Sequence, residues 1–267
     1  MLAQTVAMRL TYHATGFSLS DRPLRDDGAG SSALLVTAHP DDECMFFVPT
    51  LEELLHDGVE INVLCLSTGD YEGLGAVRAR ELRASCALLG LPDERVRCID
   101  DPQLQDGPAN AWPPAKVAAL VHAHLHALGV SRVVTFDGHG VSGHPNHVAV
   151  HAGVRLLASS SSPAWRLEAP LAIYELESTV LLRKHLSVWD VLLSLLITVV
   201  RAVWCVRAST LDGPHACCCV TARPWRCHAA MRAHATQYVW YRKLYVLTSR
   251  YACVNTLRRW RGACLLE

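Results

Sequence analysis

From residue 33 onward, short runs of apolar and β-branched residues alternate with longer segments whose apolar residues recur at helical spacing. The short runs predict strands over residues 33–38, 61–67, 96–99, 132–136 and 171–175. The longer segments predict helices over residues 42–56, 75–89, 114–128 and 145–157. Strand and helix alternating in this way predict an α/β fold, with a Rossmann-like, doubly wound, mainly parallel sheet and helices on both faces.

After residue 177 the pattern becomes helical, arginine-rich and aromatic through Trp260. We therefore expect an N-terminal segment over residues 1–32, an α/β domain over 33–180 and a helical, basic extension over 181–267. Residues 1–18 hold no apolar run long enough for a signal peptide or a spanning helix.

The most apolar stretch of the chain covers residues 186–206, but Asp190 and Arg201 leave an uninterrupted apolar core of only ten residues. Ten helical residues cannot cross a hydrocarbon layer of about 30 Å. Trp189 and Trp204 flank this core, as aromatic residues do at a membrane interface. The stretch predicts an interfacial or buried helix, and a dry core helix is the alternative.

Composition fits a folded protein, because 51% of the 267 residues are hydrophobic and 19% are charged. The net charge of zero hides an asymmetry. Residues 1–200 carry 14 basic and 23 acidic side chains, and residues 201–267 carry 11 basic and 2 acidic ones. The C-terminal quarter is therefore expected to meet an anionic partner such as a membrane surface. The 11 cysteines form no tight, even framework, so we expect reduced thiols.

The first predicted strand leads directly into the sequence AHPDDE, residues 38–43. This order places His39, Asp41 and Asp42 at the carboxyl end of the sheet, where such folds bind ligands. The imidazole and one carboxylate can bind a divalent cation, and the other carboxylate can take a proton from water. Alternatively, Asp41 and Asp42 serve only as acids at a helix N-terminus, a role that leaves His39 unexplained.

A second polar cluster, residues 136–147, follows the fourth predicted strand and includes three glycines, Asp137, His144 and His147. The first and fourth strands of a doubly wound sheet are neighbours, so His39, Asp42 and His147 are expected to converge. Two imidazoles, one carboxylate and an open position match a hydrolytic zinc site, although iron(II) accepts the same donors.

The sequence here resembles the LmbE-like zinc-dependent de-N-acetylases, through AHPDDE at 38–43 and GHPNH at 143–147. The resemblance extends to the eukaryotic N-acetylglucosaminylphosphatidylinositol de-N-acetylases of GPI-anchor biosynthesis. It is carried by HPDDECMFFVPT at 39–50, TFDGHGVSGHPNH at 135–147, LRKHLSVWD at 182–190 and HATQYVWYRKLYVLTSRYACVNTL at 234–257. The last segment discriminates, because bacterial members of the superfamily that act on soluble substrates lack it.

This resemblance implies a catalytic α/β domain in which zinc is bound by His39, Asp42 and His147. It further implies that Asp41 is the general base and that His144, protonated, stabilises the oxyanion. The implied reaction removes the N-acetyl group of N-acetylglucosaminyl phosphatidylinositol, a membrane glycolipid, to release acetate. The implied location is the cytoplasmic face of the endoplasmic reticulum membrane, reached by peripheral or interfacial attachment.

Weaker candidates accompany these residues. Arg78, three residues before Glu81, is a candidate contact for the inositol phosphate, with an ion pair inside its helix as the alternative. Asp137 is a second candidate substrate contact. His122, His124 and His126 are expected on a solvated helix surface, because only the first and last share a helix face. The Cys217–Cys219 run with Cys227 and His228 matches no common zinc-finger spacing, and Asp100 and Asp101 fit a turn as well as a cleft.

Two other functions remain open from the sequence. One is a deacetylase of a soluble N-acetylglucosamine conjugate, and the other is a catalytically silent binding subunit. A silent binding subunit would have no chemical need for three metal ligands together with the additional carboxylate of Asp41. Nucleic-acid binding is not expected, because the arginine-rich tail contains no recognised binding module.

Overall fold

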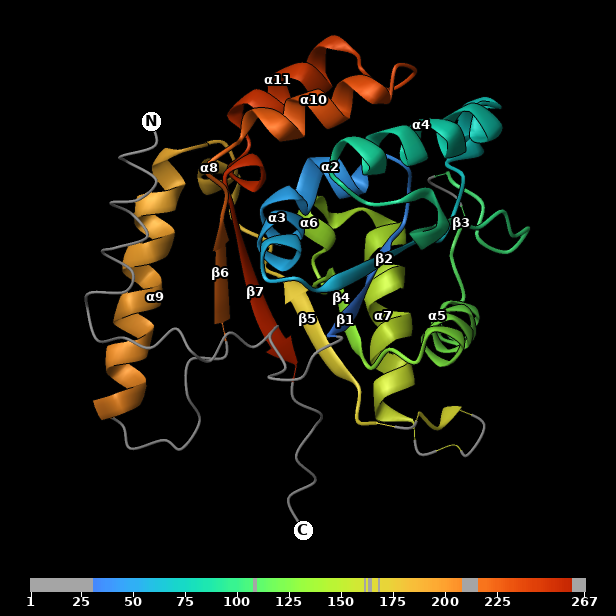
Figure 1. The fold of residues 1–267 in the computed structure, drawn as a ribbon, viewed down its shortest axis with the longest axis horizontal. Coiled ribbons are helices and arrows are strands. Elements are labelled where there is room, and N and C mark those ends of the chain that lie inside the picture. The colour runs from blue at the N-terminus through green and yellow to red at the C-terminus, as the bar shows by residue number, and fades with distance from the viewer. Residues whose placement is uncertain are drawn as a thin grey trace.

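The structure is a computed structural model that describes residues 31–107, 110–160, 162, 165–167, 169–207 and 216–260. Within this part of the chain a seven-stranded sheet has the order β3-β2-β1-β4-β5-β7-β6 (Figure 1). Its strands are β1 (Ser32–Thr37), β2 (Glu60–Cys65), β3 (Val96–Cys98), β4 (Arg132–Phe136), β5 (Ala172–Leu176), β6 (Ala216–Val220) and β7 (Val254–Trp260).

Helices surround the sheet. They are α2 (Asp42–Phe46), α3 (Val48–His56), α4 (Gly75–Leu88), α5 (Pro114–Leu128), α6 (Gly140–Gly143), α7 (Pro145–Ser159), α8 (Leu181–Lys184), α9 (Trp189–Arg207), α10 (Trp225–Ala233) and α11 (Trp240–Thr248). Single 3-10 turns lie at Asp70–Glu72, Asp93–Arg95 and Arg250–Ala252.

The parallel part of the sheet confirms the predicted fold class. Strands β1 to β5 all pair in parallel, and β1 lies between β2 and β4. Leu34 and Leu35 of β1 face Val133 and Val134 of β4 in register. The two polar clusters therefore leave the sheet from neighbouring strands at the same edge, as the sequence predicts.

Each face of the sheet has its own hydrophobic core, because successive side chains of a strand point to opposite faces. Ala33 and Leu35 of β1 pack with α3, α4 and α10, whereas Leu34 and Val36 pack with α5 and α7. These residues are almost fully buried. Near-continuous apolar strands of this kind are typical of a sheet that helices cover on both faces.

The helix predicted over residues 42–56 is divided in the structure. Helix α2 ends at Phe46 and α3 begins at Val48, with Phe47 between them in a non-helical conformation. Pro49 lies in the first turn of α3. Proline lacks an amide hydrogen and its ring obstructs the preceding turn, so it suits the start of a new helix better than the interior of a continuous one.

The prediction of helical structure through Trp260 was wrong for two segments. Residues 216–220 and 254–260 form β6 and β7, and β7 pairs antiparallel with β5. Buried and exposed positions alternate only weakly in these strands, and the three consecutive cysteines of β6 give no clear two-residue period. The C-terminal extension thus continues the same sheet.

Helix α9 confirms the expected helix within residues 186–206, and one of its faces packs on the sheet extension. Asp190 and Val191 are buried, whereas Trp189, Leu192 and Leu196 are exposed. No helix within the described ranges is both long enough and apolar enough to span a membrane.

A buried ionic cluster attaches α9 to the C-terminal strands. Asp190 accepts two hydrogen bonds from Arg183, of 2.8 and 3.0 Å, and one of 2.5 Å from Arg250. Both Asp190 and Arg250 are fully buried. Burial raises the pKa of Asp190, but the hydrogen bonds from the two arginines outweigh it and hold that pKa below its ordinary value. Asp190 thus anchors the extension by charge as well as by packing.

Substitution of Asp190 by Asn should lower the free energy of unfolding by about 3–5 kcal/mol at pH 7, because it leaves two arginines near an uncharged partner. The lowered pKa means that the carboxylate stabilises the fold above its unfolded pKa of about 4 and loses this effect as the pH falls through the folded pKa. Urea denaturation at several pH values checks both points.

The exposed Arg95–Glu60 pair, 2.8 Å apart, provides the matched control. Glu60→Gln should cost less than about 1 kcal/mol. Equal losses for Asp190→Asn and Glu60→Gln would contradict the anchoring role of Asp190.

Candidate active site and metal centre

The site begins where β1 ends, and the carboxylate of Asp42 organises this turn. Its Oδ2 atom accepts hydrogen bonds from the backbone amides of Ala38 and His39, at 3.0 and 2.8 Å. The Asp42 side chain is buried, and burial raises its pKa, but the contacts with His147 and His39 outweigh this and hold the pKa below its ordinary value. Asp42 is therefore an anionic, fixed group.

His147 lies in the first turn of α7, after β4, and contacts Asp42, which follows the neighbouring strand β1. Its Nε2 atom lies 3.1 Å from Oδ1 of Asp42, and its Nδ1 atom lies 3.0 Å from the carbonyl oxygen of Gly140. The ring stacks on Phe136 with 4.0 Å between the centroids. A Cβ at Gly140 would lie 2.8 Å from the Cβ of His147, so only glycine allows this approach.

His39 and His144 complete a group of three imidazoles. One ring nitrogen of each of His39, His144 and His147 lies within 4.8 Å of the others. Nε2 of His39 also lies 2.9 Å from the side-chain amide nitrogen of Asn146 and 3.2 Å from Asp106. With Asp42 3.9 Å from Nδ1 of His39 and 3.1 Å from Nε2 of His147, the structure places the three predicted ligands together and His144 beside them.

The donor set fits a zinc ion. Two ligands bound at about 2.0 Å to a tetrahedral centre lie about 3.3 Å apart, close to the separation between His147 and Asp42. Imidazole and carboxylate donors suit Zn²⁺ and also Fe²⁺. Among the described residues, none donates a hydrogen bond to the buried Oδ2 atom of Asp41, and a catalytic role is one explanation for such a group.

Asp41 has a strained backbone and faces two arginines. Its φ angle is 110°, in the left-handed region that residues other than glycine seldom adopt. Nη2 of Arg78 and Nη2 of Arg242 each lie 3.5 Å from its Oδ2 atom. Burial raises the pKa of Asp41, and the charges of Arg242 and Arg78 limit that rise. A buried carboxylate of this kind can accept and return a proton.

His144 caps α7 and accepts a hydrogen bond of 3.3 Å from the backbone amide of Asn146 at its Nδ1 atom. Burial and the neighbouring His39 and His147 lower the pKa of His144 to about 4. The neutral ring is therefore favoured at neutral pH. With Nδ1 accepting, its proton lies on Nε2, where it can be donated to a ligand.

Sequence reasoning missed a buried pair that supports Asp41. Oε2 of Glu43 accepts the backbone amide of Asp41 at 3.1 Å, and Oε1 lies 2.8 Å from Nε2 of His234. Glu43 and His234 are fully buried. Burial opposes both charges, but their attraction prevails, lowering the pKa of Glu43 and raising that of His234. Both residues lie within the quoted motifs, which was the available signal.

The predicted substrate contacts have internal partners. Arg78 donates to the carbonyl oxygens of Gly69 and Pro40, at 2.7 and 2.8 Å. Glu81 accepts from the backbone and side chain of Thr236, at 2.8 and 2.6 Å, so the helix ion pair considered as an alternative does not form.

Both oxygens of Asp137 are likewise used within the chain. They accept hydrogen bonds from the amides of His139, Gly140 and Ser178 and from the Ser178 hydroxyl. These contacts hold the glycine-rich turn in front of α7. A role of Asp137 in substrate binding stays a prediction.

The weaker candidates lie outside the site. His122 and His126 lie on α5 with their ring centroids 6.2 Å apart, and neither belongs to a possible metal group of the described residues. Asp101 pairs with Lys116 at 2.6 Å. The Cys217–Cys219 run lies in β6 and forms no metal group in the part of the chain that the structure describes.

Comparison with known proteins places this chain in a family. The profile of the PIG-L family, described as GlcNAc-PI de-N-acetylase, matches residues 34–158. An N-acetylglucosaminyl-phosphatidylinositol de-N-acetylase of Bos taurus is 39% identical over 230 residues, covering 86% of this chain and 84% of that protein. The chain belongs to the PIG-L family. A probable enzyme of the same name from Schizosaccharomyces pombe is 34% identical and covers 86% of this chain and 88% of its own.

More distant proteins match less of the chain or only its fold. A 1D-myo-inositol 2-acetamido-2-deoxy-alpha-D-glucopyranoside deacetylase of Actinosynnema mirum is 34% identical over 162 residues, covering 50% of this chain and 57% of that protein. The N,N'-diacetylchitobiose deacetylase structure from Pyrococcus horikoshii has a TM-score of 0.59 at 17% identity, covering 97% of this chain and 93% of that chain. The PIG-L family member described here thus has the fold of a deacetylase of known structure.

Arg242 is another site residue that sequence reasoning did not single out, and its charge faces the proposed base. Arg242→Ala should lower the kcat of deacetylation about 10- to 100-fold with little change in KM, because Asp41 loses a partner that orients it. Arg242→Lys should restore part of the loss. Steady-state kinetics check this prediction, and the exposed Arg232→Ala variant on α10 should behave as wild type. A change in KM alone would contradict it.

Proposed function

We propose that this chain hydrolyses the N-acetyl group of N-acetylglucosaminyl phosphatidylinositol, giving glucosaminyl phosphatidylinositol and acetate, an early step of GPI-anchor biosynthesis. The observation that carries the proposal is the group of three imidazoles of His39, His144 and His147, together with the buried carboxylate of Asp41 in the same turn as His39, whose Oδ2 accepts no hydrogen bond from the described residues. The names of the relatives that match most of this chain support the substrate. The enzyme is thus a hydrolase acting on a linear amide bond.

We further propose that His39, Asp42 and His147 hold Zn²⁺, with Fe²⁺ as the other cation that suits these donors. When bound, such a cation supplies a Lewis acid that polarises the acetamide carbonyl and lowers the pKa of water.

The residues of this chain then provide the proton transfers. Asp41 removes a proton from the attacking water while the oxygen of that water bonds to the acetamide carbon. His144 donates a hydrogen bond from Nε2 to the carbonyl oxygen, on which negative charge develops. Asp41 returns its proton to the nitrogen as the C–N bond breaks, so that acetate and a free amine leave. The neutral form of His144 suffices for this role, whereas the resemblance implied the protonated form.

The substrate is proposed to reach the site from a membrane. Five of the eight basic side chains of residues 216–260 are exposed, and this range contains no acidic residue, which supports an anionic membrane surface as the partner of the extension. We propose location at the cytoplasmic face of the endoplasmic reticulum membrane, with residues 33–180 as the catalytic domain and residues 181–267 next to the membrane. Arg78 remains the proposed contact for the inositol phosphate, and nucleic acid is not a proposed partner.

A soluble conjugate is the second candidate substrate. The observation that favours it is the 34% identity with the deacetylase from Actinosynnema mirum, whose name describes a glycoside of inositol without lipid. That match covers only half of this chain, whereas the match to the Bos taurus enzyme covers most of it. The glycolipid is therefore the favoured substrate.

Acetate release by purified, zinc-loaded protein tests the proposal, with the glycolipid in detergent and the soluble N-acetylglucosamine inositol conjugate as parallel substrates. The lipid should be the better substrate, and Asp41→Asn should reduce turnover about 100-fold or more, because Asn keeps the shape but cannot take a proton. Removal of the metal by a chelator should abolish turnover, and Zn²⁺ should restore it.

Asp93→Asn, which changes an exposed carboxylate, is the matched control and should leave turnover unchanged. Better turnover of the soluble conjugate would favour the second candidate. Metal-independent turnover, or full activity of Asp41→Asn, would contradict the mechanism.

A further inference from the structure

Helix α11 exposes a row of large apolar and aromatic side chains. Trp240, Leu244 and Leu247 recur at a spacing of three and four residues, so they share one face, and Tyr241 lies beside them. Trp240 is 74% exposed and Leu247 is 70% exposed. Side chains of this size are rarely so exposed together unless the surface has a partner.

The segment from α8 to the start of α9 extends the same surface. Leu181, Leu182 and Trp189 are all more than 70% exposed. Two contacts place this segment next to the end of α11. Nδ1 of His185 lies 3.0 Å from the Thr248 hydroxyl, and the hydroxyl of Ser187 donates to the carbonyl oxygen of Leu247 at 3.3 Å. These exposed residues thus form one surface, named here the apolar platform, which consists of Leu181, Leu182, Trp189, Trp240, Tyr241, Leu244 and Leu247.

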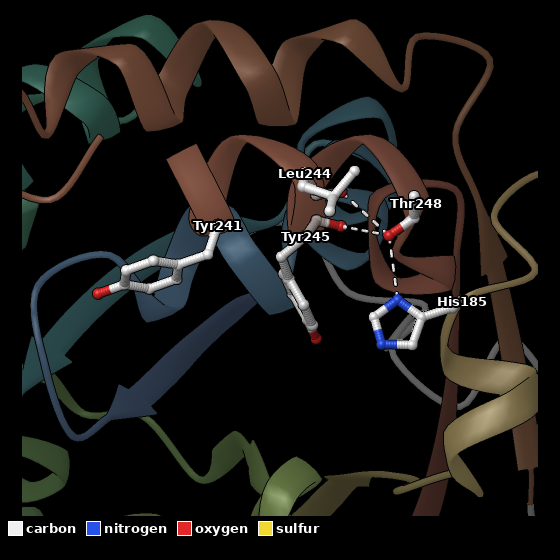
Figure 2. A pocket seen from close by; sticks show the side chains of 5 residues that line it. All are labelled: His185, Tyr241, Leu244, Tyr245 and Thr248. Carbon is white, nitrogen blue, oxygen red and sulfur yellow. Dashed lines mark hydrogen bonds between the residues drawn. The ribbon is translucent and has the colours of Figure 1, made fainter. Parts of the chain in front are cut away.

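A hollow of about 300 Å³ opens in this platform. Its lining comes from both sides of the platform (Figure 2), and consists of His185, Tyr241, Leu244, Tyr245 and Thr248. One of these lining residues, Tyr245, connects the hollow to the catalytic site. The Tyr245 ring lies 6.0 Å from that of Phe46, which in turn lies 5.7 Å from the ring of His147. The hollow is therefore only two aromatic rings away from a proposed metal ligand.

The platform also lies at the functional end of the sheet. Figure 1 shows α10 and α11 over α2, at the end where α8 lies and toward which β5 points. Arg242 of α11 reaches inward to Asp41, while its neighbour Tyr241 faces the hollow. One helix therefore contributes both to the platform and to the catalytic site.

Charge indicates which partner suits this surface. The α10 and α11 region carries the exposed cations Arg232 and Lys243, and residues 216–260 contain no acidic residue. Lys243 lies over the ring of Tyr238, 4.4 Å from its centroid, at the margin of the platform. Aromatic and aliphatic side chains bordered by cations match the interface of a bilayer that contains anionic lipids.

We propose that the apolar platform docks onto the surface of a lipid bilayer containing anionic lipids, with the hollow accepting part of a hydrocarbon chain. The proposal deepens the proposed function and rests on it in one respect, since docking at this face presents the catalytic site to a glycolipid in the same bilayer. A second copy of this chain is the other possible occupant, and the experiment separates the two.

Sedimentation of the full chain with substrate-free vesicles tests the proposal. The vesicles contain phosphatidylcholine alone or phosphatidylcholine with phosphatidylserine. Wild-type protein should bind the anionic vesicles more tightly, and the double variant Trp240→Glu, Leu247→Glu should bind them about tenfold more weakly or worse, because it places charge where apolar side chains enter the interface.

The double variant Leu128→Glu, Leu156→Glu is the matched control, because it adds the same charge at exposed leucines of α5 and α7. It should bind vesicles as tightly as wild type. Acetate release from the soluble conjugate should be the same in wild type and both double variants, which shows that the fold and the catalytic site are intact.

Three results would overturn the proposal. They are equal vesicle binding by the two double variants, no preference of wild type for anionic vesicles, and a wild-type dimer that only the α11 variant dissociates. Because the vesicles contain no substrate, these results are independent of catalysis. Absence of acetate release from both substrates would instead count against the proposed function and leave the vesicle result interpretable.

Discussion

The carboxylate of Asp42 is the group on which the site depends. One oxygen binds the amides of Ala38 and His39, which fixes the turn at the end of β1, and the other contacts His147 at the start of α7. A single side chain thus joins two segments that are about a hundred residues apart in sequence and adjacent only because β1 and β4 pair. Without that pairing the imidazoles and the proposed base would not meet.

The C-terminal extension is the second constraint, and it is part of the active site. The buried pair of Glu43 and His234 links the motif after β1 to the end of α10, and Arg242 places a cation beside Asp41. Breaking a buried ion pair typically costs about 3–5 kcal/mol, so the extension and the catalytic turn stabilise each other. The extension also supplies α11, so the catalytic site and the apolar platform depend on the same contacts.

Much of this arrangement was predictable from the sequence. The alternation of strands and helices gave the parallel sheet, and the strand order of such sheets brings His39 close to His147. The sequence did not reveal β6 and β7, because consecutive cysteines and arginines obscure a two-residue period. Nor did it reveal the left-handed backbone of Asp41 or the approach of Arg242, since both depend on packing between segments far apart in the chain.

X-ray absorption spectroscopy at the zinc edge of the loaded protein tests the central claim most directly, namely that the ends of β1 and β4 form one metal centre. The account predicts two imidazole nitrogens and at least one carboxylate oxygen at about 2.0–2.2 Å, with one imidazole lost in His147→Ala. A metal environment containing thiolate sulfur at about 2.3 Å, or one that His147→Ala leaves unchanged, would contradict it.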